Sequence, residues 1–178
     1  TDRCNFRCVY CMPREIFGPG YAFLPRTDLL TLEEIARVAK VFSALGMRKV
    51  RITGGEPLIR RNLEHLIEMI GATEGVQDIS LTTNGSMLTA DRAVSLRQAG
   101  LKRLTISLDA LDDATFKSIN DVDYPASRVL DGINNARAAG FSDIKVNAVV
   151  RRGLNEHAVL DLAKHFRHSG CIVRFIEY

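Results

Sequence analysis

The sequence predicts an α/β fold, a partial (β/α)6 barrel of the TIM type with parallel strands whose first strand is truncated. The main observation is a repeated sequence pattern, called the repeated phrase below. It consists of a helix-like run, a glycine, a few polar residues and then a β-branched run. It recurs at residues 44–53, 73–83, 98–108, 138–150 and 168–178. Successive copies start about 25–40 residues apart, the length of a βα unit, and the crossover connections of such units join parallel strands. A sixth strand is expected just upstream of Cys4, with only its end in this chain.

The first thirty residues are predicted to form a long ordered loop. Prolines and glycines interrupt them at Pro13, Pro19, Pro25, Gly18 and Gly20. The loop also carries a C-x3-C-x2-C spacing, formed by Cys4, Cys8 and Cys11. Because this loop would follow the first strand, we expect its cysteines at the carboxyl-end edge of the barrel, where parallel α/β folds bind ligands.

The segments between the strands are predicted to be helical. Thr31 and Glu34 have the spacing of a capping box at the start of a helix over 31–45. One face of that helix is apolar and consists of Ile35, Val38, Ala39 and Phe42. Thr89 is the expected cap of a helix over 88–99, and Asn155 that of a helix over 154–168. The glycine of each repeated phrase suits a helix C-terminus, because it adopts the left-handed conformation without a Cβ clash.

The predicted strands alternate between apolar and polar residues, unlike the strands of a filled barrel. One face should meet the helices and consists of Val50, Ile52, Ile79, Leu81, Leu104, Ile106, Leu108, Ile144, Val146, Val173 and Phe175. The other face consists of Arg51, Thr53, Ser80, Thr82, Asn84, Thr105, Ser107, Asp109, Lys145, Asn147 and Arg174. We expect this polar face to line an incompletely filled interior with room for ligands; exposure of the face to solvent is the alternative.

The polar face includes the cations Arg51, Lys145 and Arg174. Burying an unpaired cation is costly, so cations that converge on one cavity indicate a polyanionic ligand, and guanidinium groups suit phosphate. Internal ion pairs with Asp109 or Glu177 are the alternative.

Composition indicates one globular domain with a sizeable core. The 178 residues are 46% hydrophobic and 25% charged, and the net charge of +3 is too small to favour general nucleic-acid binding. No apolar run is long enough to span a membrane, and no secretory leader is visible. The chain opens at Thr1 without a methionine, so we expect it to be a single domain, residues 1–178, cut from a longer protein.

The three clustered cysteines indicate a metal site in a reducing compartment. A chain of this size does not need disulfides, and clustered free thiols would be prone to oxidation. Structural zinc takes four protein ligands. The only other cysteine is Cys171, expected as a small buried residue at the opposite end of the barrel, and the four histidines lie on two helices away from the loop. On a [4Fe–4S] cluster, three thiolates leave one iron free to bind another ligand.

Five blocks of the chain resemble a known family. "TDRCNFRCVYCMP" and the "GGEP" at 54–57 are similar to the cluster and glycine-rich motifs of the radical S-adenosylmethionine (SAM) superfamily. With "VRITGGEPLIRRN", "LTTNG", "TISLDA" and "VRFIEY", the chain resembles the GTP 3′,8-cyclase family of molybdenum cofactor biosynthesis over essentially its whole length.

The resemblance implies a [4Fe–4S] cluster and SAM as cofactors and GTP as substrate. Reductive cleavage of SAM would give a 5′-deoxyadenosyl radical that abstracts the C3′ hydrogen of the GTP ribose and drives cyclisation to 3′,8-cyclo-7,8-dihydro-GTP. A reductant or electron-donor protein and a second enzyme that forms the cyclic pterin are implied as partners, a homodimer is allowed, and a cytoplasmic location follows from the reducing compartment. Nucleic acid and membrane partners are not expected.

The resemblance also assigns roles to residues. Cys4, Cys8 and Cys11 would bind three irons, and no catalytic residue beyond these ligands is implied. The residues expected to bind SAM are Tyr10, Gly54, Gly55, Glu56, Pro57 and Ser107. The residues expected to bind GTP are Arg51, Thr82, Lys145 and Arg174.

Two features of the family are missing from this chain. One is an arginine shortly before the first cysteine, and the other is a C-terminal second cluster on three cysteines that binds the guanine base. Other functions stay open: a peptide-modifying or sulfatase-maturing radical SAM enzyme, or a non-catalytic metal-binding module.

Overall fold

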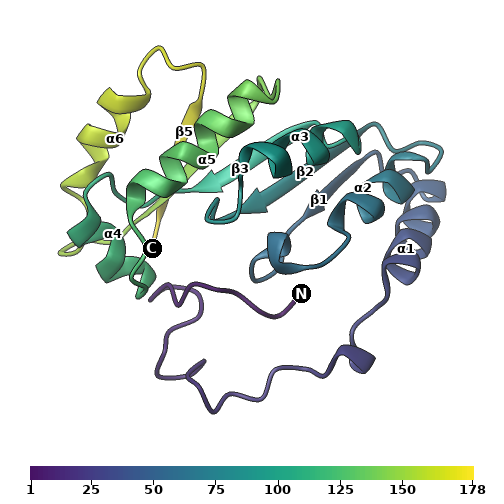
Figure 1. Cartoon of the computed structure of the whole chain (residues 1–178), viewed down its shortest axis with the longest axis horizontal. Helices are drawn as coiled ribbons and strands as arrows, with labels where there is room; N and C mark the ends of the chain where they lie inside the picture. Colours follow the sequence, from purple (N-terminus) through teal and green to yellow (C-terminus); the bar gives the residue numbers. More distant parts are fainter.

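Five parallel strands form one curved sheet in the order β1-β2-β3-β4-β5 in a computed structural model that describes residues 1–178 (Figure 1). The strands are β1 (Lys49–Ile52), β2 (Asp78–Thr83), β3 (Arg103–Ser107), β4 (Ile144–Val150) and β5 (Ile172–Glu177). The α-helices are α1 (Leu32–Ala44), α2 (Leu63–Gly71), α3 (Ala90–Gln98), α4 (Asp113–Asn120), α5 (Ala126–Ala138) and α6 (Ala158–Phe166). Each neighbouring pair in the sheet is consecutive along the chain, so the fold is an open, partial barrel of βα units.

The predicted helix ends are largely confirmed. Thr31 and Glu34 form both hydrogen bonds of a capping box, and the Thr89 side chain accepts from the Arg92 N–H. The glycines of the repeated phrase all have positive φ angles, between 82° and 104°. The strand that follows each glycine begins within a few residues, so the helix stop and the strand start are both local properties of the phrase.

The hydrophobic core lies between the helices and the apolar face of the sheet. It includes Leu81, Leu104, Ile106 and Val146 from the strands, together with apolar side chains of α2, α3, α5 and α6. This confirms the predicted apolar face for β2, β3 and β4, with the polar face on the side away from the core. Phe175 of the last strand was wrongly included in the apolar face, since it is 41% exposed and lies outside the core.

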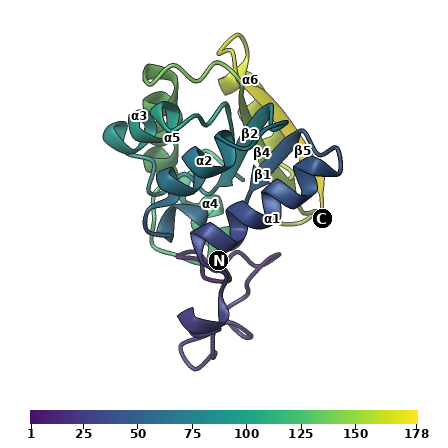
Figure 2. The same ribbon diagram turned by 90° about the vertical axis from the view of Figure 1, so that its right-hand side faces the viewer.

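Residues 1–31 form a loop that lies along the lower side of the fold in both views (Figures 1 and 2). A short 3-10 helix, η1 (Arg26–Asp28), is its only regular element. At its start, Thr1–Arg3 run beside the segment after β1: the Gly55 N–H donates to Thr1 O (2.9 Å) and the Glu56 N–H donates to Arg3 O (2.8 Å). The start of the chain therefore lies where the end of a preceding strand was expected, although Thr1–Arg3 themselves form no strand.

Several local expectations were wrong. Only Ala39 of the expected apolar face of α1 is buried, and Val38 and Phe42 are 44% and 54% exposed. The reason is that α1 packs on α2 beside β1, an edge strand with no partner on its other side. Cys171 is half-buried rather than buried, although it contacts the core.

Asn155 does not cap the last helix. The residue before α6 is His157, which makes no capping hydrogen bond with its side chain. The Asn155 side chain is buried and instead donates to the backbone carbonyls of Asp109 and Val149.

The connection between β3 and β4 contains two helices. After α4 the chain turns at Asp121, whose φ is 46°, and α5 starts after Pro125. Pro125 explains the break between the two helices, because the residue before a proline disfavours helical conformation. None of the helices combines the length and apolar composition needed to cross a lipid bilayer.

Candidate cluster and ligand site

The cysteine loop packs against the ends of β2, β3 and α4. Asn84, which follows β2, lies with its Nδ2 atom 3.8 Å from Cys4 Sγ, and the Phe6 N–H also points at this sulfur (3.4 Å). Cys8 Sγ lies 2.9 Å from Oδ1 of Asn120, the last residue of α4. The cysteines are therefore at the carboxyl-end edge of the sheet, as the sequence predicted.

The backbone of the loop is fixed on α4 by two further hydrogen bonds. The Arg7 N–H donates to Asn120 O (3.0 Å), and the Val9 N–H donates to Ile119 O (2.9 Å). The Arg7 guanidinium closes the loop from within, because it donates to the carbonyls of Cys4, Phe6 and Phe17 at 2.8 Å each.

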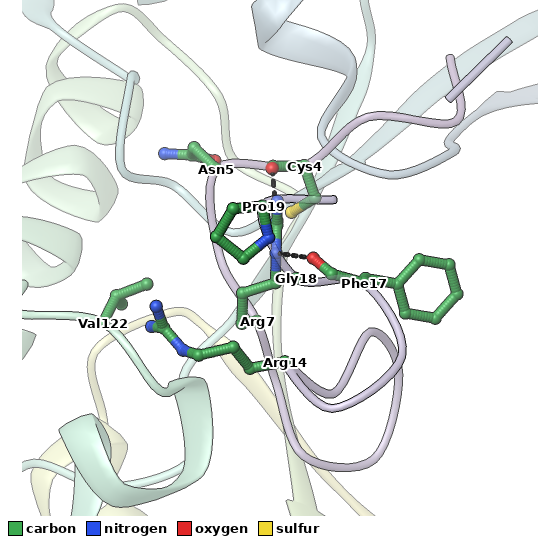
Figure 3. Close-up of a pocket in the computed structure, with 8 residues that line it drawn as sticks. All are labelled: Cys4, Asn5, Arg7, Arg14, Phe17, Gly18, Pro19 and Val122. Carbon is green, nitrogen blue, oxygen red and sulfur yellow. Dashed lines mark hydrogen bonds between the residues drawn. The ribbon is translucent and has the colours of Figure 1, made fainter. Parts of the chain in front are cut away.

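A cavity of about 310 Å³ lies directly beside Cys4. Figure 3 shows the Arg7 guanidinium in this cavity, with its hydrogen bonds to the carbonyls of Cys4 and Phe17. Arg14 lines the same cavity, and its guanidinium forms an ion pair with Asp121 (2.7 Å). Two guanidinium groups thus line the outer wall of the cysteine loop, and that of Arg14 is paired with a carboxylate.

The donor set of the loop fits an iron–sulfur cluster. All four cysteines of the chain are free, and Cys4 and Cys8 are each close enough to Cys11 for charge on one to raise the pKa of another. No three His, Cys, Asp or Glu side chains converge on a single point that could hold one metal ion. A polynuclear cluster does not require such convergence, because each thiolate binds a different iron.

The Cys4 and Cys8 thiols are protonated in the absence of metal. Burial raises the pKa of Cys4, and burial, with the charges of Asp109 and Cys4, raises the pKa of Cys8 to about 12. Metal ligation requires the thiolate, so cluster insertion must release protons here.

Tyr10 and Asp109 connect the loop to the sheet. Tyr10 Oη donates to Asp109 Oδ2 (2.8 Å), and burial raises the pKa of Tyr10. Asp109 follows β3 on the polar face and is 1% exposed; its Oδ1 accepts from the Val149 N–H (2.8 Å). The sequence placed Asp109 on the polar face but did not identify it as an anchor of the loop.

The structure predicts a pH effect at Asp109. Burial raises its pKa from 3.8 to about 6, so the folded state binds this proton more tightly than the unfolded state does. Stability from this group is complete below pH 4 and is lost as the pH rises to 6. For the metal-free protein, the loss is expected to be about 2–3 kcal/mol. Urea unfolding from pH 4 to 7 should show this decline in the parent relative to Asp109→Asn; parallel pH profiles for the two proteins would contradict it.

The glycine-rich segment contacts the start of the chain. A Cβ on Gly55 would lie 2.1 Å from Arg3 O, and one on Gly54 would lie 2.5 Å from Thr1 O. The N–H of Gly55 is used by Thr1, but the carbonyls of Gly54 and Gly55 accept no backbone hydrogen bond. They are free to accept hydrogen bonds from a cationic ligand group.

The other two residues of this motif are buried supports. Glu56 is 1% exposed, and its carboxylate accepts from Leu58 N–H (2.9 Å), Thr83 Oγ1 (2.7 Å) and Asn84 N–H (2.7 Å). Burial raises its pKa. Pro57 is buried at the start of a second 3-10 helix, η2 (Pro57–Ile59). Both residues hold the segment against β2.

The remaining predicted ligand residues lie on the polar face. In the register of the sheet, Thr82 and Lys145 both pair with Thr105, and Ser107 and Arg174 both pair with Asn147. Residues that pair across the sheet form a row. Thr82 and Lys145 share one row, and Ser107 and Arg174 share the next row of this face toward the carboxyl ends of the strands. Arg51 is exposed on the edge strand β1, one row closer to the amino end of the strands.

The expected cations have no carboxylate partners. Arg51, Lys145 and Arg174 take part in none of the ion pairs of the structure, so the alternative of internal pairs with Asp109 or Glu177 is not realised. Arg174 Nε instead donates to Asn147 Oδ1 (2.9 Å), a contact on the polar face that the sequence had not indicated. All of these side chains are half-buried or exposed, so in this open sheet the polar face is not an enclosed cavity.

Comparisons with known proteins agree with this geometry. The family model of the radical SAM superfamily matches residues 1–166. GTP 3′,8-cyclase of Acidothermus cellulolyticus is 56% identical over 178 residues, which is 100% of this chain and 49% of that protein. GTP 3′,8-cyclase of Staphylococcus epidermidis is 48% identical over 100% of this chain and 52% of its own length. The chain thus spans about half the length of the curated relatives it matches.

Solved structures share the fold at low sequence identity. Streptococcus suis SuiB bound to S-adenosylmethionine matches with a TM-score of 0.78 and 17% identity, over 99% of this chain and 38% of that one. HydG, a maturase of the [FeFe]-hydrogenase, matches with a TM-score of 0.76 and 15% identity, over 99% and 40% of the two chains. From the match over residues 1–166, with the three-cysteine loop at the carboxyl-end edge of a parallel sheet, it follows that the chain belongs to the radical SAM superfamily.

Proposed function

We propose that this chain is the radical-generating domain of a GTP 3′,8-cyclase that acts in molybdenum cofactor biosynthesis. The observation that carries the proposal is the set of cations without carboxylate partners on the polar face, which adjoins the cysteine loop. The names of the relatives, at 56% and 48% identity over the whole chain, support the same substrate.

The superfamily uses a [4Fe–4S] cluster and SAM, which supply one-electron cleavage of a sulfonium and hydrogen abstraction when bound. Cys4, Cys8 and Cys11 would hold three irons. The carbonyls of Gly54 and Gly55 would accept from the SAM ammonium, and Tyr10 and Ser107 would border the rest of SAM. Glu56 and Pro57 would act indirectly, by holding the glycines in place.

Lys145 and Thr82 would bind GTP one row further from the cysteines, and Arg51 would reach the triphosphate from the edge strand. Arg174 lies in the row of Ser107, so its charge would bridge the two ligands. Charge-assisted hydrogen bonds from these groups would fix the ribose relative to SAM.

Partners and location belong to the same proposal. The electron would come from a reductant outside the chain, and a second enzyme would convert the product to the cyclic pterin. The four free cysteines support a reducing, cytoplasmic compartment. A region with a second cluster that binds guanine would lie outside residues 1–178.

A peptide-modifying function is less well supported. The likeness to SuiB is one of fold at 17% identity, and a peptide substrate gives no reason for unpaired cations on the polar face.

Replacing Arg51 or Lys145 with alanine is expected to weaken GTP binding by about 10-fold each, because each removes a charge-assisted contact to phosphate. Equilibrium binding of GTP to the full-length, anaerobically reconstituted protein measures this, with iron content as the check that the cluster is intact. Lys102→Ala is the matched control, since Lys102 is an exposed cation before β3 at the opposite edge of the sheet. Unchanged GTP affinity in both variants would refute the proposed phosphate site.

A further inference from the structure

Asp109 is a buried carboxylate without a cationic partner. It is 1% exposed, and no Lys, Arg or His forms an ion pair with it. Its hydrogen-bond partners are the Tyr10 hydroxyl and the Val149 N–H, each at 2.8 Å. A buried charge of this kind destabilises the fold. Its presence at the carboxyl-end edge of the sheet therefore points to a role in function.

The Asp109 hydrogen bond joins segments that are 99 residues apart in sequence. Tyr10 lies between Cys8 and Cys11 in the turn formed by the Cys11 and Met12 N–H groups, both of which donate to Cys8 O (2.9 Å). A hydroxyl fixed at this point restrains the position of both cysteines relative to β3. The same bond places the Tyr10 hydroxyl beside Asp109, two residues after β3 ends at Ser107.

Asp109 is itself held by Asn155. Asn155 Nδ2 donates to Asp109 O (3.0 Å) and to Val149 O (2.8 Å), and Asn155 Oδ1 accepts from the Arg151 N–H (2.9 Å). Asn155 is also 1% exposed. The loop after β4 therefore orients Asp109, and Asp109 orients the cysteine turn.

The charge of Asp109 also acts on the cysteine turn. A fixed negative charge in a low-dielectric setting favours the more positive state of a neighbouring redox centre, and net charge is one of the levers on iron–sulfur potentials. The nearest cations of the loop, Arg7 and Arg14, are directed at backbone carbonyls and at Asp121 on its outer wall, and they do not neutralise Asp109.

We propose that Asp109 is a positioning residue: through Tyr10 it fixes the Cys8–Cys11 turn on the sheet, and its charge lowers the reduction potential of the cluster held there. This inference rests on cluster binding by the cysteine loop, as in the proposed function. A lower potential makes the reduced cluster a stronger one-electron donor to the SAM sulfonium.

The charge is tested with Asp109→Asn in the full-length, anaerobically reconstituted protein. The midpoint potential is read from the EPR signal that changes when SAM is added, which identifies this cluster. Asp109→Asn should shift the potential to a more positive value. Asp143→Asn, which removes an exposed carboxylate before β4 at the opposite edge, should leave it unchanged. An unshifted potential in Asp109→Asn, even with lower thermal stability, would overturn the proposal.

The positioning is tested with Tyr10→Phe, which removes the hydroxyl but keeps the charge of Asp109. SAM affinity should fall severalfold, with a smaller change in potential than in Asp109→Asn. If Asp109→Asn cannot hold iron, Tyr10→Phe decides alone, and SAM binding equal to the parent's would reject the proposal. Neither readout uses GTP, so this inference and the cyclase proposal can fail separately.

Discussion

Replacing Cys8 with serine is expected to remove the cluster and reduce SAM cleavage below detection. A cluster that uses three protein ligands cannot spare one of them, and a serine hydroxyl is a poor ligand for iron compared with a thiolate. The fold should survive, because a serine hydroxyl can still donate to Asn120 Oδ1 as the Cys8 thiol does. Iron content and 5′-deoxyadenosine formation under strong chemical reduction measure the effect.

Cys171→Ser is the matched control for this experiment. Cys171 directly precedes β5, at the edge of the sheet opposite the cysteine loop, so its variant should keep both iron and SAM cleavage. Full iron content with normal cleavage in Cys8→Ser, or loss of iron in Cys171→Ser, would contradict the assignment of ligands.

Replacing Gly55 with alanine is expected to detach the start of the cysteine loop from the sheet. The new Cβ would lie 2.1 Å from Arg3 O and 2.5 Å from the Arg3 carbonyl carbon, which are backbone atoms that cannot move away as a side chain can. Relief of the clash would break the bond from the Glu56 N–H to Arg3 O. We expect a loss of about 3 kcal/mol in stability together with reduced iron incorporation, because Arg3 directly precedes Cys4.

Chemical unfolding and iron analysis of Gly55→Ala check this prediction. Gly20→Ala is the control, since Gly20 lies in the same loop with no atom within 4 Å of its added Cβ and no positive φ. Equal stability and iron content in the two variants would show that the close approach at Gly55 is not required.

Much of the fold could be predicted because its signals are local. A glycine after an amphipathic run stops a helix, and the β-branched run that follows starts a strand, so the phrases around Gly46, Gly75, Gly100, Gly140 and Gly170 indicated the observed strands. Crossover length then required parallel pairing. The exposure of Val38 and Phe42 was not predictable in this way, because it depends on which elements flank β1.

The sequence indicated the candidate ligand residues but not the residues that hold them in place. Cysteine spacing and the polar strand positions are visible in the sequence. The contacts of Asp109 with Tyr10 and of Asn120 with Cys8 join segments 99 and 112 residues apart, and they depend on the path of a long loop. The available signal was weak: a polar residue directly after an apolar strand, as at Asp109. The prediction that Asn155 caps a helix was wrong for a related reason. An asparagine shortly before a helix has the sequence pattern of a cap, whatever its partners in the folded protein are.

Under the proposed function, the full-length protein generates a radical at the cysteine loop and directs it to the ribose of GTP. Full-length protein given a reductant, SAM and GTP deuterated at C3′ should release 5′-deoxyadenosine that contains deuterium. Release of unlabelled 5′-deoxyadenosine at the same rate with and without GTP would contradict the claim.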